Sequence, residues 1–289
     1  MARMVNAVVP LYGSKRQMAA TIVDALGPHT AYLAPFVGSC AVEFVKPPCR
    51  MEVLNDLSGK LINLIRVVQR DELAPSLFDR LARTVFCEEL YRDSVAKLAA
   101  GDAGGLPWAV YDDLPSLEWA YPSLEWAYHY FVASWMGRNG LAGTTLELKS
   151  GFCVRYTSGG GDPAQRFRQA VESLPGWWAR LRNCTILRRD GIELCERFED
   201  RAGSVVYADP PYLSKQATYT HDFTEDDHKR LAAALCRFRE TRVVVSYYAD
   251  SRLAELYPGW RVIPVAVRKN LAVRAGNEPA PEVLLVNQP

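Results

Sequence analysis

The feature that most constrains the fold of this chain is a regular alternation of short apolar segments with helical patterns. Helical spacing of apolar residues covers 14–26, 58–69 and 224–239, and the last of these opens with Thr224 and an acidic first turn. The alternation of strands with helices predicts an α/β fold with a largely parallel sheet covered on both faces. The seven expected strands are Ala31–Phe36, Arg50–Asn55, Cys184–Arg189, Ser204–Ala208, Arg242–Tyr248, Arg261–Arg268 and Glu282–Asn287.

The alternation is interrupted once, between about residues 70 and 183, where helical patterns dominate. We therefore expect one domain formed by 1–69 and 184–289 and an inserted, mainly helical domain at 70–183. The insert contains an identical pair of heptapeptides, at 115–121 and 122–128. Because Pro122 opens the second copy and disfavours a helix through both, we expect that copy to belong to a helix that continues through Tyr130, Val132 and Trp135.

Composition limits the class of protein. The chain has 49% hydrophobic residues but no apolar run long enough for a membrane span, and its first residues do not resemble a secretion signal. A cytoplasmic protein is expected. The seven cysteines and four histidines are scattered without zinc-site spacing, so we expect reduced thiols and no metal.

Charge is distributed unevenly although the net charge is only +1. Residues 71–128 hold eleven acidic and four basic residues, whereas 137–189 hold nine basic and three acidic ones. A basic segment in a neutral chain suits a surface that faces a polyanion, and an Arg-rich solvated helix is the alternative interpretation.

The strongest motif follows the fourth expected strand, where Val205–Ala208 leads into Asp209-Pro210-Pro211-Tyr212. Ligand sites in open α/β sheets lie at this end of the strands. The prolines fix φ and remove two backbone donors, so the loop presents its carbonyls stiffly. A carboxylate beside such a carbonyl can accept both hydrogens of an exocyclic amine, and a tyrosine can stack on a base. The alternative is a loop in which the acid starts a turn and the prolines end the strand.

With this loop the sequence resembles the Dam-like DNA adenine-N6 methyltransferases, in the compact form common in bacteriophages. Further blocks resemble the family in order, namely Leu11–Lys15, Ala34–Ala41, Asn55-Asp56, Asp190, Asp227-His228, Val245–Tyr248, Leu256–Trp260 and Glu282–Asn287. Ala34 and Cys40 stand where the family often has Glu and a second Gly, and we expect Cys40 to pack in the place of that glycine. The resemblance implies a Rossmann-like seven-stranded methyltransferase sheet, the cofactor S-adenosylmethionine and an inserted target-recognition domain.

The resemblance also implies the roles of individual residues. The loop after the first strand would hold the methionine part of the cofactor, Asp56 the ribose and Asp190 the adenine. An N-cap for Asp56 and a turn acid for Asp190 are equally weighted alternatives. The implied cofactor residues are Tyr12, Lys15, Pro35, Phe36, Gly38, Ser39, Asp56, Asp190 and Asp209, and the implied catalytic residues are Asp209, Pro210, Pro211 and Tyr212.

We therefore expect a site-specific enzyme that flips adenine out of double-stranded DNA, stacks it on Tyr212 and methylates its N6 amine. We expect a monomer in a bacterial cell. Either the host or a phage could encode it, and it could act with or without a partner restriction nuclease. N4-cytosine methylation and a catalytically silent nucleic-acid-binding homologue remain alternatives.

The paired Trp177-Trp178 is more typical of a core than of a stacking platform. The expected DNA contacts are Arg138, Asn139, Arg155, Arg166, Arg168 and Arg180.

Overall fold

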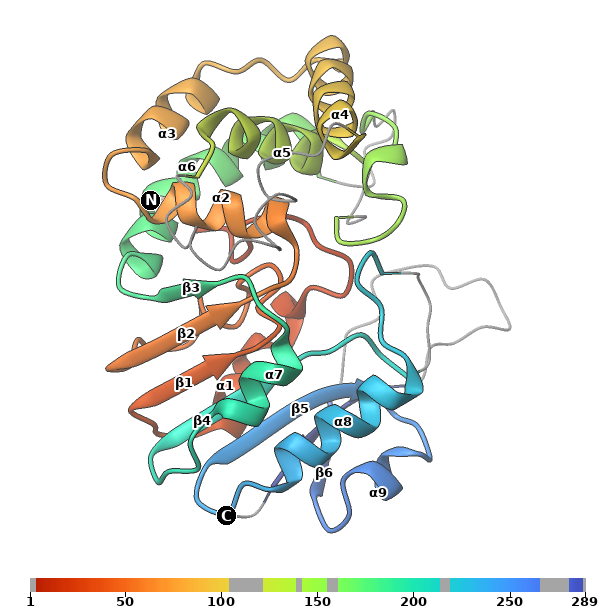
Figure 1. Cartoon of the computed structure of the whole chain (residues 1–289). Coiled ribbons are helices and arrows are strands. Elements are labelled where there is room, and N and C mark those ends of the chain that lie inside the picture. Colours follow the sequence, from red (N-terminus) through yellow and green to blue (C-terminus); the bar gives the residue numbers. More distant parts are fainter. Residues whose placement is uncertain are drawn as a thin grey trace. The chain divides into compact units, whose positions relative to one another are not determined.

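The computed structural model describes residues 4–103, 122–138, 142–154, 161–213, 219–265 and 281–287. The chain divides into two compact units. The sheet unit comprises Lys15–Leu57 and Cys184–Pro289, and the helical unit comprises Met1–Ser14 and Ser58–Asn183. Figure 1 shows the strands and helices that form each unit.

The sheet unit confirms all seven expected strands, with ends that differ by a few residues. The strands are β1 (Ala31–Ala34), β2 (Met51–Asn55), β3 (Thr185–Leu187), β4 (Ser204–Ala208), β5 (Arg242–Tyr248), β6 (Arg261–Pro264) and β7 (Glu282–Val286). Their order in the sheet is β3-β2-β1-β4-β5-β7-β6. The first five strands in this order pair in parallel, and β7 is antiparallel to both β5 and β6. The fold is therefore a Rossmann-like α/β sheet of the predicted class.

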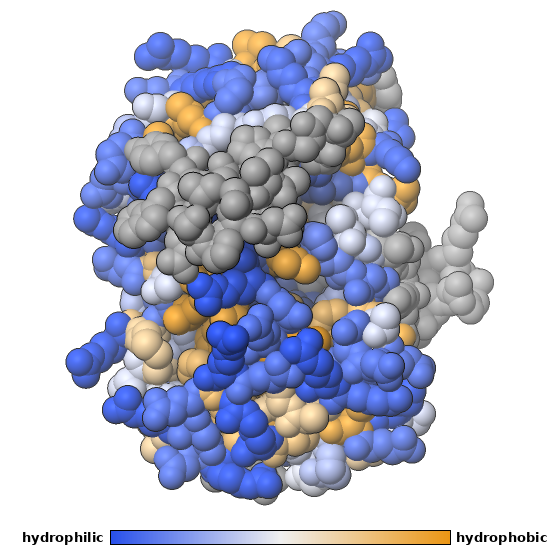
Figure 2. All heavy atoms as spheres, in the orientation of Figure 1, coloured by the Kyte–Doolittle hydropathy of each residue, from blue (hydrophilic) through white to orange (hydrophobic). Residues whose placement is uncertain are grey.

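The helices of the sheet unit are η1 (Lys15–Gln17), α1 (Ala19–Leu26), α7 (Gly191–Arg197), α8 (Glu225–Cys236) and α9 (Leu253–Leu256). In Figure 1, α7 and α8 lie in front of the sheet and α1 lies behind it. The start of α8 is the predicted one, because Thr224 and Asp227 form a reciprocal capping box. Figure 2 shows mostly hydrophilic residues, with smaller hydrophobic areas between them, on the face that carries α7 and α8.

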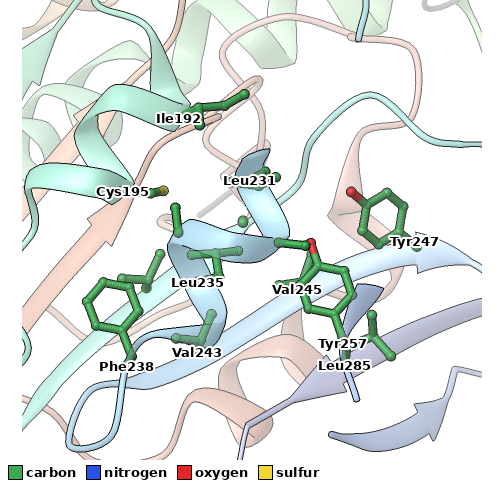
Figure 3. Packing of buried hydrophobic residues seen from close by; sticks show 14 of the residues in the cluster. Ile192, Cys195, Leu231, Leu235, Phe238, Val243, Val245, Tyr247, Tyr257 and Leu285 are labelled. Carbon is green, nitrogen blue, oxygen red and sulfur yellow. The ribbon is translucent and has the colours of Figure 1, made fainter. Parts of the chain in front are cut away.

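A hydrophobic core fills the space between α7, α8 and one face of the sheet (Figure 3). Alternation along β5 builds this core, because Val243, Val245 and Tyr247 point toward α8 whereas the residues between them point to the other face. Ser246 is one of the residues on that other face, and it is completely buried. The sheet thus fixes the direction of each side chain that leaves its carboxyl edge.

The helical unit contains α2 (Gly59–Gln69), α3 (Ala74–Ala82), α4 (Glu88–Ala103), α5 (Leu124–Met136), η2 (Glu147–Lys149) and α6 (Pro163–Leu181). Its centre is aromatic, with the Phe131 ring 5.8 Å from that of Phe167 and 6.3 Å from that of Trp177. Trp177 is therefore a core residue as expected, whereas Trp178 is half-buried and donates from Nε1 to Asp71. Helix α5 begins just after Pro122, as the sequence predicts, with Ser123 as its N-cap.

The boundaries of the compact units differ from those of the expected domains, because 4–14 and α2 belong with the helices. Trp135 and Trp177 donate from Nε1 to the carbonyls of Val8 and Val5, at 3.1 and 2.7 Å. Helix α2 packs on α5 and α6 through its buried apolar face. An amphipathic helix that follows a strand in sequence can bury its apolar stripe on either neighbour, so sequence periodicity alone does not place this boundary.

Candidate active site

The carboxyl edge of the sheet collects the loops that carry most of the expected site residues. The strand order reverses between β1 and β4, which pair in parallel at the centre of the sheet. Ligands of open α/β sheets bind outside the carboxyl ends of the strands at such a reversal. The loop after β1, Asp56 after β2, Asp190 after β3 and Asp209 after β4 all leave the sheet at this edge.

The loop after β1 is a tight backbone turn. Gly38 has φ 52° and Cys40 has φ 59°, so both lie in the left-handed region that favours glycine. Cys40 is completely buried, as expected for a residue that packs in the place of a family glycine. Asp56 holds the turn, because its Oδ2 accepts a 3.0 Å hydrogen bond from the Gly38 N–H. Ser58, not Asp56, caps α2, so the N-cap alternative for Asp56 is wrong.

Asn55 ties three loops of this edge together, and the sequence analysis did not assign it a role. Its Nδ2 donates to the carbonyls of Pro35 and Arg189, at 2.8 and 2.9 Å, and its Oδ1 accepts from the Arg189 N–H at 2.8 Å. The side chain is completely buried. The end of β2 therefore holds the loop after β1 and the loop after β3 in fixed positions.

Asp190 is the N-cap of α7, a role that differs from the turn acid expected as the alternative to cofactor binding. Its Oδ1 accepts from the N–H groups of Ile192 and Glu193, at 2.7 and 3.2 Å. Its Oδ2 lies 3.5 Å from a guanidinium nitrogen of Arg230 on α8. The carboxylate is about half exposed, so it remains accessible at the edge of the sheet. A contact to the cofactor adenine stays a prediction.

Phe36 lies half-buried between the loop after β1 and the start of α7. A Cβ on Gly191 would lie 2.5 Å from Phe36 Cε1 and 2.7 Å from the Pro35 carbonyl oxygen. Only glycine therefore permits this approach of α7 to the loop. The Phe36 ring also meets Phe223 edge-on, with ring centroids 5.6 Å apart. This contact between two aromatic rings joins segments that lie far apart in sequence.

Asp209 follows the last paired residue of β4. The pairing of β4 with β5 ends at Ala208, so the Asp209 and Pro210 carbonyls lie beyond the ladder, as predicted. Asp209 Oδ1 lies 3.0 Å from Lys15 Nζ and accepts a 2.7 Å hydrogen bond from Ser246 Oγ. Oδ2 has no hydrogen-bond partner among the described residues, and about a fifth of the side chain is exposed. Lys15 thus lies at the predicted site.

The ring of Tyr212 is packed inside the sheet unit instead of presenting an open stacking face. Tyr212 is 5% exposed, its ring meets that of Tyr248 edge-on at 4.6 Å, and Lys15 Nζ lies 4.8 Å from the ring centroid. Its hydroxyl donates to Glu282 Oε2 at 3.4 Å. Burial, together with the charges of Asp209 and Glu282, raises the pKa of Tyr212 well above its usual range. Stacking of a target base on Tyr212 stays a prediction, and it requires these neighbours to move.

Glu282 adds a second carboxylate to the site. Because β7 is antiparallel to β5, its first residue Glu282 pairs with Tyr248 at the carboxyl end of β5. Burial raises the pKa of Glu282, and the Lys15 charge opposes that effect. Burial alone would lower the pKa of Lys15, but the charges of Asp209 and Glu282 outweigh it, so the pKa is raised. Lys15 therefore stays protonated between two carboxylates.

The remaining predicted residues lie elsewhere or lack an assigned contact. Ser39 is buried in the loop after β1. Tyr12 belongs to the helical unit, where its N–H donates to the Ala142 carbonyl and burial raises its pKa. Asn139 and Arg155 lie outside the described residues. Their roles, and that of Tyr12, stay predictions.

The expected DNA-contacting arginines of α6 do not lie on one face. Successive residues of a helix are about 100° apart, which puts Arg166 and Arg180 about 40° apart and Arg168 about 160° from Arg166. Buried residues of α6, including Phe167 and Val171, lie between Arg166 and Arg168 around the helix. Arg138 is exposed after α5 and donates its backbone N–H to the Gly151 carbonyl. DNA contact by these residues is untested by the structure.

Fold and site together define a class of enzyme. The sheet is Rossmann-like with β7 antiparallel, and a proline-fixed acidic loop follows β4 at its carboxyl edge. The model of the D12 class N6 adenine-specific DNA methyltransferases matches residues 12–96 and 169–271, more than half of the chain. This chain belongs to that family.

The sequence relative agrees with the family. The chain is 25% identical over 288 residues to the retron Ec67 DNA adenine methylase of Escherichia coli, covering 95% of this chain and 89% of that protein. A solved rRNA methyltransferase from Streptomyces viridochromogenes aligns with a TM-score of 0.36 and 14% identity, over 94% of this chain and 83% of the other. The family is specific for N6 of adenine, which answers the alternative of N4-cytosine methylation.

None of the described helices has the length and apolar character to cross a membrane. Likewise, in the described ranges no three or more His, Cys, Asp or Glu side chains are grouped as a metal ion would require.

Proposed function

We propose that the carboxyl edge of the sheet unit binds S-adenosylmethionine and that Asp209 with the Pro210 carbonyl grips the N6 amine of a flipped-out adenine. The observation that carries this proposal is the state of the Asp209 carboxylate. Oδ1 is held by Lys15 and Ser246, whereas Oδ2 has no partner among the described residues. One oxygen is fixed, and the other is left to accept from a substrate.

The residues of the edge fit the cofactor that the family implies. Asp56 and Asp190 offer carboxylate acceptors to hydroxyl and amino groups, and Phe36 offers an apolar ring to a purine. The carboxylates of Asp209 and Glu282 favour a cation at the edge. S-adenosylmethionine supplies an activated methyl group on a sulfonium sulfur.

The backbone of the loop after β1 also supports an active enzyme over a silent homologue. That alternative rests on Ala34 and Cys40, which depart from the family loop. Cys40 nonetheless adopts φ 59°, the conformation that a glycine would take there, and Gly38 adopts φ 52°. The loop thus keeps a turn of the kind that glycines form, so these departures do not argue for loss of the cofactor.

The site activates the amine by hydrogen bonding. The lone pair of an adenine amine is delocalised into the ring, which makes it a poor nucleophile. Asp209 Oδ2 and the Pro210 carbonyl each accept one amine hydrogen and draw the nitrogen toward tetrahedral geometry. The nitrogen would take the methyl group that the cofactor supplies when bound, and the proton that the nitrogen then releases would go to the Asp209 carboxylate. No covalent enzyme intermediate or metal is needed, and the enzyme contributes positioning and electrostatics.

DNA supplies the adenine, and a duplex hides its amine. The target base is therefore flipped out, at a cost of a few kcal/mol. We assign the holding of DNA to the helical unit, with Arg138, Arg166, Arg168 and Arg180 as contacts. Since Arg166 and Arg168 lie on opposite flanks of α6 and Arg138 follows α5, these arginines meet different parts of the DNA or only some of them bind. The log of the affinity should fall with log salt by about 0.9 per neutralised phosphate, and a salt-insensitive complex would remove the unit from this role.

The test of the proposed function is a product assay. The protein is incubated with mixed-sequence double-stranded DNA and S-adenosylmethionine, and the DNA is digested to nucleosides for mass spectrometry. N6-methyladenine is expected with the wild-type chain and is expected to vanish in Asp209→Ala. N4-methylcytosine, or no methylated nucleoside from a protein that binds the cofactor, would overturn the proposal.

A further inference from the structure

A buried hydroxyl chain stands behind the Asp209 carboxylate. Ser246 lies on β5, and its Oγ donates to Asp209 Oδ1 at 2.7 Å. The Tyr207 hydroxyl lies 3.1 Å from the same Oγ. Ser246 is completely buried and Tyr207 is 3% exposed, so the chain is shielded from solvent along its length. Neither residue was assigned a role from the sequence.

The direction of this chain follows from the number of hydrogens. A serine hydroxyl carries one hydrogen, and Ser246 gives it to Asp209. Tyr207 must therefore donate to Ser246. Burial, reinforced by the Asp209 charge, raises the pKa of Tyr207 well above its usual range, so its hydroxyl keeps the proton it donates. The order Tyr207 to Ser246 to Asp209 is fixed at neutral pH.

The chain determines which oxygen of Asp209 faces a substrate. The β4–β5 register, with Ala208 opposite Val245, brings the next residues Asp209 and Ser246 side by side. The backbone does not fix the rotation of the Asp209 carboxylate, because its last torsion has broad minima. Two donors on Oδ1, from Ser246 and Lys15, do fix it. Oδ2 is then the oxygen left for the amine.

We propose that Ser246, oriented by Tyr207, is a positioning residue for methyl transfer that holds Asp209 Oδ1 so that Oδ2 accepts from the target amine. This inference rests on the proposed function of Asp209. It adds a residue from β5 to the machinery of a loop on β4. Ser246 does not touch the substrate, so its removal should affect the rate of transfer and leave binding of both substrates nearly unchanged.

The experiment compares Ser246→Ala with the wild-type full-length chain in single-turnover and steady-state methylation of DNA. Loss of a hydrogen bond to a charged group should lower kcat by about 10- to 100-fold. The KM values for DNA and S-adenosylmethionine should change by less than about twofold. The acid limb of the kcat profile should move to higher pH, because one fewer donor stabilises the carboxylate.

Variants separate positioning from a structural effect. Ser246→Thr keeps the hydroxyl and should recover most of kcat, even if its melting temperature differs from that of the wild type. Tyr207→Phe keeps the hydrogen bond from Ser246 to Asp209 but removes the hydroxyl that orients Ser246. This variant should therefore lower kcat by less than Ser246→Ala. Ser204→Ala is the matched control, because Ser204 is also a buried serine of the sheet but lies at the amino end of β4. It should leave kcat and the pH profile unchanged.

Two results would overturn the inference. One is a Ser246→Ala enzyme with the wild-type kcat and pH profile while Asp209→Asn is inactive. The other is a fall in kcat without any shift of the acid limb, which would show general loosening of the site. If Asp209→Asn itself retains the wild-type rate, the proposed function fails first, so the two failures are distinguishable.

Discussion

Replacing Asn55 with alanine should weaken both the fold and the cofactor site. The variant loses three hydrogen bonds of 2.8, 2.9 and 2.8 Å from a side chain with no solvent access. At about 1 kcal/mol each, with more if the Pro35 and Arg189 groups stay buried without partners, the loss is roughly 3 kcal/mol or more. The melting temperature should fall by roughly 6 to 12 °C, given roughly 2 to 4 °C per kcal/mol for chains somewhat shorter than this one.

The cofactor site should suffer because Asn55 joins the loop after β1 to the loop that leads into Asp190. Binding of S-adenosylmethionine, measured by calorimetry, should weaken since these loops are no longer held in place before binding. Asn287→Ala is the matched control. Asn287 is also buried, and its side chain accepts from the Val243 N–H at 2.7 Å and donates to the Thr241 carbonyl at 2.9 Å. These partners lie at the amino end of β5.

Asn287→Ala should therefore lose roughly 2 kcal/mol of unfolding free energy, measured in urea, with nearly unchanged cofactor affinity. The reasoning is refuted if Asn55→Ala costs less than about 1 kcal/mol, the typical net value of a single hydrogen bond. It is also refuted if the two asparagine variants weaken cofactor binding equally.

Three other variants probe the same units. Gly191→Ala should reduce cofactor affinity, because the added Cβ meets Phe36 and the Pro35 carbonyl at 2.5 and 2.7 Å; unchanged calorimetric binding would contradict the inferred close approach. Burial raises the pKa of Glu282 above 4.5, so the wild type should lose stability as pH rises from there, and Glu282→Gln should lack this part of the decline; parallel melting curves against pH would contradict it. Burial lowers the pKa of His129 below 6.5, so His129 favours folding above that pH. This contribution to stability is lost on acidification through the lowered pKa, and His129→Asn should flatten the dependence of stability on pH.

The strands and the loop after β4 could be predicted because their signals are local. Apolar runs bounded by breakers identify strands without reference to the rest of the chain, and all seven expected strands are present. The acid and two prolines that follow Ala208 reach the carboxyl edge because strand direction puts them there. Lys15, known only through resemblance, lies beside Asp209 as implied.

The supporting residues could not be predicted because their partners are distant in sequence. Ser246 meets Asp209 across neighbouring strands that lie 37 positions apart, and Glu282 reaches the site only because β7 runs antiparallel. Alternation of strands and helices predicts a parallel sheet, and in a parallel strand Glu282 would start at the opposite edge. The sequence signals for Glu282 are an acid that opens a strongly apolar strand and a place in the family-like block Glu282–Asn287.

Tyr212 shows the opposite limitation. Its place in the loop after β4 predicts a ring that stacks on a base, whereas Tyr248 and Lys15, which come from other segments, cover the ring. Helix α2 is similar, since its apolar stripe fits either neighbouring unit and only packing decides. Local patterns therefore predicted which elements form, and contacts between elements determined which side chains are open to a ligand.

The central claim is that Asp209 activates the amine by accepting its hydrogen. Asp209→Asn keeps the size of the side chain but removes its charge, so it tests this claim most directly. Single-turnover methylation by the variant, with DNA and S-adenosylmethionine already bound, should be slower by at least about 100-fold, while both dissociation constants stay near those of the wild type. A wild-type transfer rate in Asp209→Asn would contradict the account.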